Sequence, residues 1–130
     1  MINALTEFIP IYIQVLENKI LIRRVDDSPK SVILDAVEQF SSKRLVVAEF
    51  EPAVSLLTQG FIKTLGKPGL FKRKSKVVIH QKNEFHEPLC GVEKQLLKEL
   101  AFSVEGIHDV VVWEGKELTD NEVRNQIKNI

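Results

Sequence analysis

The sequence predicts a single α/β domain built on a mixed β-sheet, with an antiparallel hairpin unit followed by two βαβ crossovers. Three short runs rich in β-branched residues carry this prediction, because two segments with helical spacing of apolar residues separate them. The predicted strands are residues 44–50, 75–81 and 107–113, and the predicted helices are residues 51–67 and 91–103. This alternation predicts three parallel strands joined by crossover helices.

The antiparallel unit is predicted over residues 1–43. Two β-rich runs, 8–16 and 19–25, are separated only by Glu17 and Asn18. Because Asn tolerates a positive φ, a tight two-residue hairpin is expected here. From Ser31 to Phe40 the sequence is compatible with a third antiparallel strand, expected over residues 31–36, or with a short helix, and it does not decide between them.

Each predicted helix has an apolar face at helical spacing. In the first helix this face contains Val54, Leu57, Phe61, Ile62 and Leu65. In the second it contains Val92, Leu96, Leu97 and Leu100. A last helix, with Thr119 or Asp120 as N-cap and an apolar face of Val123 and Ile127, is expected in residues 114–130. Together with residues 44–113 as the crossover unit, these segments form one domain over residues 1–130.

Composition narrows the function classes. Lys plus Arg and Asp plus Glu both number 18, so the net charge is +0 and no attraction to nucleic acid or to an anionic membrane is expected. Near-neutral charge favours self-association, such as a homodimer. The single cysteine, Cys90, excludes an internal disulfide and fits a cytoplasmic protein. No stretch has the length of a membrane span or the pattern of a signal peptide.

Residues 46–81 carry a resemblance to a known family. Glu49-Phe50-Glu51, the following helix, the basic loop Leu70-Phe71-Lys72-Arg73 and the strand segment Val77-Val78-Ile79 resemble the corresponding elements of MreB, the bacterial actin homologue. The similarity extends through residues 90–114 and so covers about the last two thirds of the chain. It implies a ribonuclease-H-like fold, namely the first half-domain of an actin-like ATPase.

The departures from that family concern nucleotide chemistry. The family's first hairpin holds phosphate with an Asp-x-Gly-Thr loop, whereas residues 14–19 here contain no Gly, Asp or hydroxyl group. The resemblance aligns Glu93 with the family's water-orienting carboxylate. Without the phosphate loop, we interpret Glu93 as a first-turn residue that favours the helix dipole. We therefore predict no cofactor and no enzymatic activity.

The expected function is that of a protein-interaction or scaffold module in cell-shape or cytoskeletal regulation. The candidate surface consists of the basic loop, with Phe71, Lys72, Arg73 and Lys74, and the C-terminal segment from Trp113. The expected partner is an actin-like filament protein or a second copy of the chain. A zero net charge and one flanking aromatic residue argue against nucleic acid as the partner.

Two alternatives remain open, and a third is excluded. His80, His86 and Cys90 are metal-ligand types close in sequence, so this loop is a weak candidate for zinc or for an enzyme site. A regulatory STAS-like domain is the other alternative, with Ser55 as the nearest phosphorylatable residue. A ribonuclease-H-type nuclease is excluded, because residues 8–16 contain no acid to hold catalytic metals.

Overall fold

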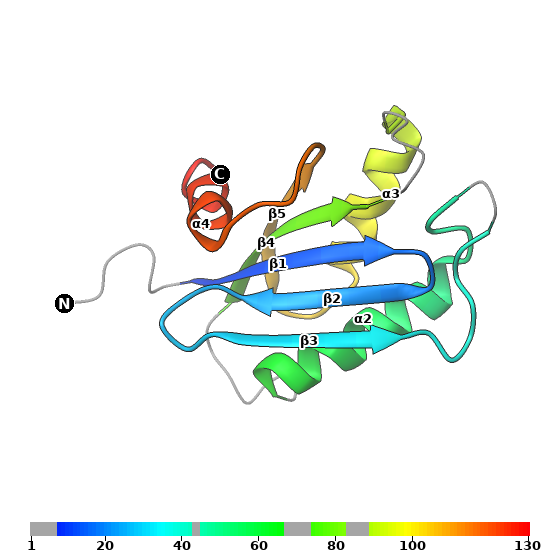
Figure 1. Cartoon of the computed structure of the whole chain (residues 1–130), viewed down its shortest axis with the longest axis horizontal. Helices are drawn as coiled ribbons and strands as arrows, with labels where there is room; N and C mark the ends of the chain where they lie inside the picture. The colour runs from blue at the N-terminus through cyan, green and yellow to red at the C-terminus, as the bar shows by residue number, and fades with distance from the viewer. Residues whose placement is uncertain (1–7, 43–44, 67–73, 83–88) are drawn as a thin grey trace.

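A computed structural model describes residues 8–42, 45–66, 74–82 and 89–130 of the chain. In these ranges the chain forms one five-stranded mixed sheet in the order β3-β2-β1-β4-β5, with three helices packed against it. Figure 1 shows α2 and α3 on one face of the sheet and α4 on the other. The predicted α/β class and mixed sheet are confirmed.

The first three strands form an antiparallel meander, as expected. They are β1 (Phe8–Leu16), β2 (Lys19–Arg24) and β3 (Lys30–Asp35). The turn between β1 and β2 has only two residues, and Asn18 adopts a φ of 49° in it. The strand that begins near Ser31 is confirmed, and the alternative helix does not form.

The remaining strands add a parallel half to the sheet. They are β4 (Lys74–Gln81) and β5 (Ile107–Trp113), which pair in parallel and are joined by the crossover helix α3 (Gly91–Phe102). Helix α2 (Phe50–Leu65) leads from β3 to β4. On its other side β4 pairs in parallel with β1, so β1 is the central strand and has one antiparallel and one parallel neighbour.

The predicted strand over residues 44–50 is wrong. Residues 45–49 are irregular, Phe50 already belongs to α2, and β1 takes the place beside β4 that this strand was expected to occupy. The apolar run has a different cause. Val47 is 4% exposed and anchors the loop to the core, and the backbone carbonyl of Phe40 accepts hydrogen bonds from the next two amides, Ala48 and Glu49. The sheet therefore contains one βαβ unit, β4-α3-β5, rather than two.

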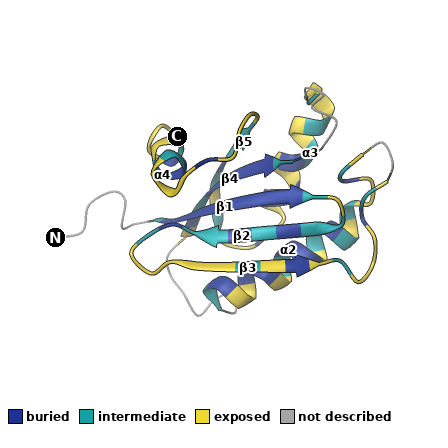
Figure 2. Cartoon of the chain, in the orientation of Figure 1, coloured by how far each residue is buried: buried dark blue, intermediate teal, exposed yellow. Residues whose placement is uncertain are grey.

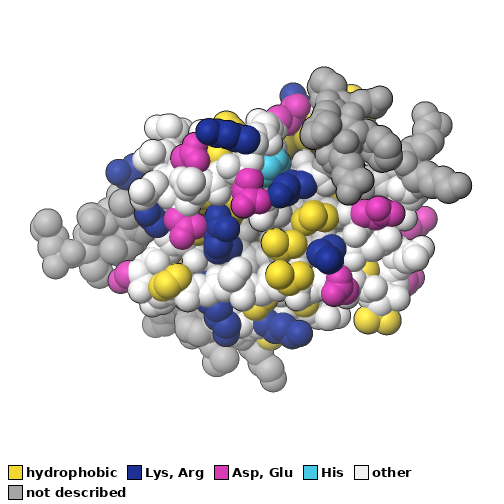
Figure 3. Space-filling model, in the orientation of Figure 1, with side chains coloured by type: hydrophobic (Ala, Val, Ile, Leu, Met, Phe, Trp, Pro, Cys, Tyr) yellow, Lys and Arg dark blue, Asp and Glu magenta, His cyan; other side chains and the backbone are white. Residues whose placement is uncertain are grey.

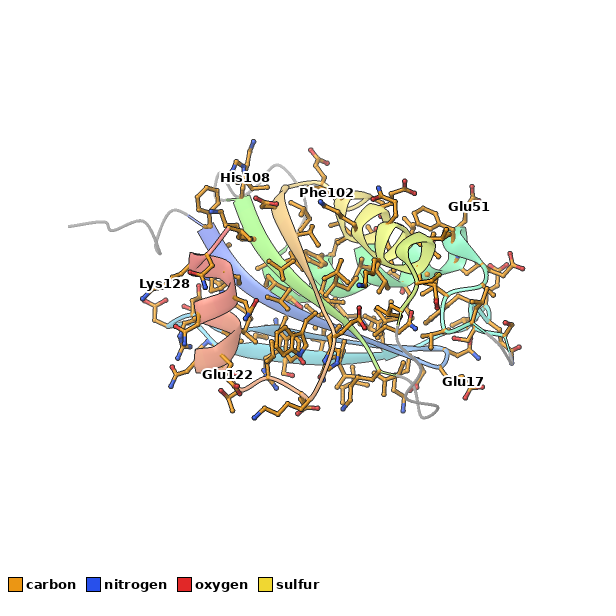
Figure 4. All side chains as sticks on the ribbon, turned by 90° about the horizontal axis from the view of Figure 1, so that it is seen from above. Glu17, Glu51, Phe102, His108, Glu122 and Lys128 are labelled. Atoms are coloured by element: carbon orange, nitrogen blue, oxygen red, sulfur yellow. The ribbon has the colours of Figure 1, made fainter. Side chains whose placement is uncertain are left out.

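The two faces of the sheet bury separate apolar cores, and Figure 2 shows the resulting buried centre of β1 and β4. Odd-numbered residues of β1, such as Ile11 and Ile13, pack under α2 and α3 in the larger core. Tyr12 points to the opposite face, where α4 covers a smaller core. Viewed along the sheet in Figure 4, α4 lies on one side and α2 with α3 on the other.

The buried faces of α2 and α3 differ in part from the expected ones. Ile62 is 39% exposed and Val92 is 78% exposed, so neither belongs to the core. The buried residues of α2 are Ala53, Leu56, Leu57, Gly60, Phe61 and Thr64, and those of α3 are Leu97, Leu100 and Ala101. These sets include small residues, which let the helices lie close to the sheet. The buried face of each helix therefore differs from the face predicted from large apolar residues alone.

The last helix is α4 (Asp120–Lys128), and Thr119 is its N-cap, as one of the two predicted alternatives. The Thr119 hydroxyl accepts a hydrogen bond from the amide of Glu122, whose carboxylate accepts one from the amide of Thr119. Val123 and Ile127 are buried against the sheet, as predicted. None of the helices in the described residues is long and apolar enough to cross a membrane.

Candidate functional site

A group of hydrogen-bonded polar side chains, three of them buried, lies towards the carboxyl ends of β1 and β4, on the face that carries α4. Its members, called the polar cluster below, are Tyr12, Gln14, Arg23, His80, Lys82 and Glu117. The parallel register pairs Gln14 with His80, so their side chains are neighbours on this face. In open α/β sheets ligands bind outside the carboxyl ends of parallel strands, which makes the polar cluster the first place to look for chemistry.

Tyr12 and His80 form the buried centre of the polar cluster. The Tyr12 hydroxyl lies 2.7 Å from Nδ1 of His80 and accepts a hydrogen bond from the backbone amide of Leu118. Nε2 of His80 lies 2.9 Å from the carbonyl oxygen of Gly115, which can only accept. The neutral imidazole therefore carries its proton on Nε2, and the Tyr12 hydroxyl donates to Nδ1. Burial lowers the pKa of His80 and raises the pKa of Tyr12, which keeps both groups neutral.

Glu117 closes the polar cluster on the solvent side. One carboxylate oxygen accepts hydrogen bonds from the Gln14 amide at 3.0 Å and from the Lys82 ammonium at 2.8 Å. The hydrogen bond from Lys82, followed by that from Gln14, lowers the pKa of Glu117. Gln14 is 4% exposed, and this contact gives its side chain a partner at the edge of the buried region.

Arg23 ties the cluster to α4. Its guanidinium carbon lies 5.2 Å from the centre of the Tyr12 ring, and Nη2 donates to the carbonyl oxygen of Leu118 at 3.1 Å. Nε lies 2.8 Å from a carboxylate oxygen of Asp120, an ion pair whose geometry does not align a hydrogen bond. Further along the helix, Arg124 donates to the carbonyl oxygen of Val25 at 2.6 Å. These contacts fix the segment after β5 and the start of α4 on the sheet.

The hydrogen bonds of the polar cluster connect β1 and β4 to the C-terminal segment. Both ring nitrogens of His80 have partners inside the protein, and the Glu117 carboxylate is bound to Gln14 and Lys82. Among the described residues no group of three or more His, Cys, Asp or Glu side chains is arranged to hold a metal ion. Neither β1 nor β4 contains an acid.

The turn between β1 and β2, at the same end of the sheet, is closed by its own hydrogen bonds. The Asn18 amide donates to the hydroxyl of Ser41 at 2.8 Å. Its side-chain oxygen accepts hydrogen bonds from the backbone amides of Phe40 and Ser41, both at 2.8 Å. In this position a phosphate-binding loop would direct free amides outward. Here the turn holds the 40–41 segment instead.

Glu93 and Cys90 lie at the start of α3. The Glu93 carboxylate accepts a hydrogen bond from the backbone amide of Cys90 at 3.2 Å, as part of a capping box in which Cys90 is the N-cap. This geometry agrees with the interpretation of Glu93 as a first-turn residue. Glu114 lies nearby, pairs with Lys94 at 2.8 Å and accepts from the amide of Leu89; the hydrogen bond from Lys94 lowers its pKa.

The three weak metal-ligand candidates are not brought together in the described residues. His80 is 3% exposed, and both of its ring nitrogens have hydrogen-bond partners inside the protein, so neither offers a free lone pair to a metal. His86 lies outside the described residues. Cys90 is exposed and free. A lone exposed thiol does not make a metal site.

The predicted interaction residues are only partly described. Phe71, Lys72 and Arg73 lie outside the described residues, whereas Lys74 is exposed at the start of β4. Trp113 is half-buried at the other end of the parallel strands, and its indole nitrogen donates to the carbonyl oxygen of Lys116 at 2.9 Å. Lys74 and Trp113 therefore do not share one surface.

The end of α4, by contrast, does lie near the start of β4. The Lys76 ammonium is 3.3 Å from the carbonyl oxygen of Ile130 and lies over the Phe8 ring at 4.4 Å. The C-terminus and the beginning of β4 thus form one surface, called the basic end below and defined by Lys74, Lys76 and Ile130.

Sequence reasoning missed most of the polar cluster. Gln14 was a visible signal, because it is a polar residue in an otherwise apolar run. Glu117 had none, because it lies in the loop before α4 and meets Gln14 across 103 positions of sequence.

In comparisons with known proteins, no family model matches the chain and no curated protein matches it.

Proposed function

We propose that this chain is a non-enzymatic protein-interaction module with a ribonuclease-H-like fold, related to the first half-domain of the actin-like ATPases. This fold is supported by the order of the sheet, in which the first strand of an antiparallel meander pairs in parallel with β4, and β4 with β5. Helices on both faces of the sheet also support it (Figure 1). The resemblance of residues 46–81 to MreB supports the relation to actin-like proteins.

The observation that supports the functional proposal concerns the end of the sheet where a nucleotide-binding protein of this fold would hold its ligand. The polar groups at this end form hydrogen bonds with other parts of the same chain. The β1–β2 turn has its amide and its side chain bound to the 40–41 segment. The polar cluster beside it holds α4. Neither feature offers the free amides or the paired carboxylates that phosphoryl transfer or two-metal hydrolysis requires.

The surface proposed for a partner is the basic end together with the basic segment that precedes β4 in the sequence and contains Phe71, Lys72 and Arg73. Lys74 is exposed and the chain terminus lies beside Lys76, so positive side chains and a carboxyl-terminal helix meet there. A partner with an acidic surface fits this charge. An actin-like filament protein is the partner class that the sequence resemblance favours, with a role in cell-shape or cytoskeletal regulation.

The test is an affinity pull-down from the native cell with identification of the captured proteins by mass spectrometry. Recovery of an actin-like filament protein, reduced by Lys72→Glu with Arg73→Glu, is the expected result. Lys94→Glu with Lys98→Glu is the matched control, because it makes the same change in net charge at two exposed cations of α3. If both variants lost capture of the filament protein equally, the loss would be an effect of net charge and would argue against this surface. Tight binding of Mg-ATP to the isolated chain would overturn the non-enzymatic proposal.

The two alternatives gain no support. For the metal or enzyme site, His80 is not a suitable ligand, because both of its ring nitrogens are hydrogen-bonded inside the protein. The STAS-like alternative requires a phosphorylatable serine at a helix start that follows a strand. Ser55 lies inside α2, and residues 45–49 before this helix are irregular.

A further inference from the structure

The outer edge of β3 presents backbone groups that can pair with another strand. β3 is the last strand of the sheet, and β2 is its only strand neighbour in the described part of the chain. The amide of Ala36 donates to the carbonyl oxygen of Asn18, on the side of β2. Backbone groups alternate between the two sides of an antiparallel strand, so those of Ser31, Ile33 and Asp35 are directed away from β2.

This edge lacks the features that usually prevent strand pairing. Protected edges carry proline, inward-pointing charges or a bulge. β3 has none of these between its ends, and its register with β2 is regular over the whole strand. Ile33, in the middle, is 63% exposed. Its charges are confined to Lys30 at one end and Asp35 at the other, where Asp35 pairs with Lys19 at 3.6 Å.

We propose that a second copy of this chain pairs with the edge, β3 against β3, in antiparallel orientation about a twofold axis that passes beside Ile33. In this register Ile33 lies opposite Ile33 of the second copy, and Ser31 lies opposite Asp35. Each of these opposed residues can then exchange both backbone hydrogen bonds with its counterpart. The Ser31 hydroxyl also faces the Asp35 carboxylate of the second copy, so a donor meets a charged acceptor. This inference does not rest on the proposed function.

Other symmetric registers fit less well. A twofold axis perpendicular to the sheet keeps each side chain on its own face, so odd-numbered residues pair only with odd-numbered ones. A shift by two residues in one direction sets Ile33 against Asp35, and in the other direction it sets Asp35 against Pro29, which has no amide hydrogen. A further shift in the first direction sets Asp35 against Asp35, and like charges directly opposite are destabilising.

The helices are spaced to accept this pairing. Gly60 of α2 packs against Ile22 of β2 and Leu34 of β3, so the helix axis lies above the gap between these strands. Neighbouring strands are ~4.8 Å apart. At Gly60 the axis of α2 therefore lies about one strand spacing from the twofold axis, so at this point the two helices would be ~10 Å apart, at the upper end of the usual distance between packed helices. Because α2 crosses the strands obliquely (Figure 1), contact between the two helices is expected in this region.

The opposite face of the sheet would gain a continuous apolar row. Leu21 and Ile33 are paired across β2 and β3, and pairing places the same two residues of the second copy in line with them. Figure 3 shows hydrophobic side chains gathered over this part of the sheet, beside the area that α4 covers. Joining the two edges would cover the most exposed residue of the row, Ile33.

The first test measures the oligomeric state of the full chain by sedimentation velocity over a range of concentrations. A dimer is expected, and Ile33→Lys should weaken it at least about tenfold, because two charged side chains would face each other where two apolar ones did. Val92→Lys is the control, since Val92 is an even more exposed apolar residue, on α3. A monomer at every concentration, or equal weakening by both substitutions, would overturn the proposal.

The second test fixes the register by oxidative cross-linking in a Cys90→Ser background. Ile33→Cys should form a disulfide-linked dimer, because directly opposed residues bring their Cα atoms to ~5.5 Å. Ser31→Cys should not, because the two cysteines would be displaced by four residues, ~13 Å along the strand. The double variant Ser31→Cys with Asp35→Cys should cross-link again. Cross-linking of Ser31→Cys as efficient as that of Ile33→Cys would refute the register.

Discussion

We expect the stability of the wild-type chain to depend on pH near neutral pH, and replacement of His80 by glutamine should remove this dependence. His80 is 3% exposed and neutral, with Nδ1 accepting from Tyr12 and Nε2 donating to Gly115. A second proton on Nδ1 would face the Tyr12 hydroxyl, which already accepts from the amide of Leu118. Burial, together with the positive charge of Lys82, lowers the pKa of His80, and the hydrogen bond to Gly115 and the charge of Glu117 oppose this effect only in part.

The sign and size of the effect follow from proton linkage. In the unfolded chain His80 titrates with a pKa near 6.5, whereas in the folded chain its pKa is lower. Below pH 6.5 the unfolded state therefore binds more protons, and the free energy of unfolding falls as the pH falls towards the folded-state pKa. One proton gives at most ~1.4 kcal/mol per pH unit, and this slope is reached only below the unfolded-state pKa. Over the two units from pH 7.5 to pH 5.5, the free energy of unfolding is therefore expected to fall by up to ~1.4 kcal/mol in total.

The assay is urea unfolding at several pH values between 5.5 and 7.5. Carboxylates with lowered pKa values, such as Glu117, lose their contribution mainly below pH 4.5, outside this window. His80→Gln should be ~1–3 kcal/mol less stable at pH 7.5 and should show a flat profile. His108→Gln, which changes an exposed histidine of β5, should keep the wild-type slope. A slope that survives in His80→Gln, or that disappears in His108→Gln, would refute the assignment to His80.

Three further substitutions test how the structure is held together. Tyr12→Phe leaves the buried partners of the hydroxyl unpaired and should lower the free energy of unfolding by ~2–4 kcal/mol in urea; a loss under ~0.5 kcal/mol would contradict the hydrogen-bond assignments. Gly60→Ala introduces a methyl group that collides with Ile22 and should cost ~1–2 kcal/mol, whereas Gly91→Ala meets no neighbour and should be close to neutral in the same assay. Asn18→Ala removes the acceptor of two amides and a residue suited to positive φ, so its melting temperature should fall well below that of Asn18→Asp, which retains the acceptor.

The elements with a strong local signal were predictable from the sequence. The two-residue turn at Asn18, the strands of the meander and the capping of α4 by Thr119 follow from neighbouring residues alone. The strand expected over residues 44–50 failed because burial of Val47 in a loop produces the same apolar signal as a strand. A local run of apolar residues indicates that the segment is buried. Whether it is a strand or a loop anchored to the core depends on whether a neighbouring strand pairs with it.

The polar cluster was not predictable for a related reason. Its members come from β1, β2, β4 and the loop before α4, and no fixed spacing connects them. His80 was noticed as a possible ligand because of His86 and Cys90 nearby in sequence. Its actual partners, Tyr12 and Gly115, are 68 and 35 positions away. A histidine in a buried strand position is better tested first against distant strand neighbours than against adjacent loop residues.

The position of β1 in the sheet determines which surfaces remain open to a partner. Because β1 is central and buried on both faces, polar groups that it directs to the α4 face need partners inside the protein. The C-terminal segment supplies them through Glu117, which binds Gln14, and Leu118, which binds Tyr12. The sheet face nearest the carboxyl ends is thereby closed by the chain itself. Within the described residues, the two surfaces proposed for binding lie outside this closed region: the basic end, and the edge of β3 with Ile33 at its centre. They depend on different forces, since salt should weaken binding at the basic end and leave pairing through β3 largely intact.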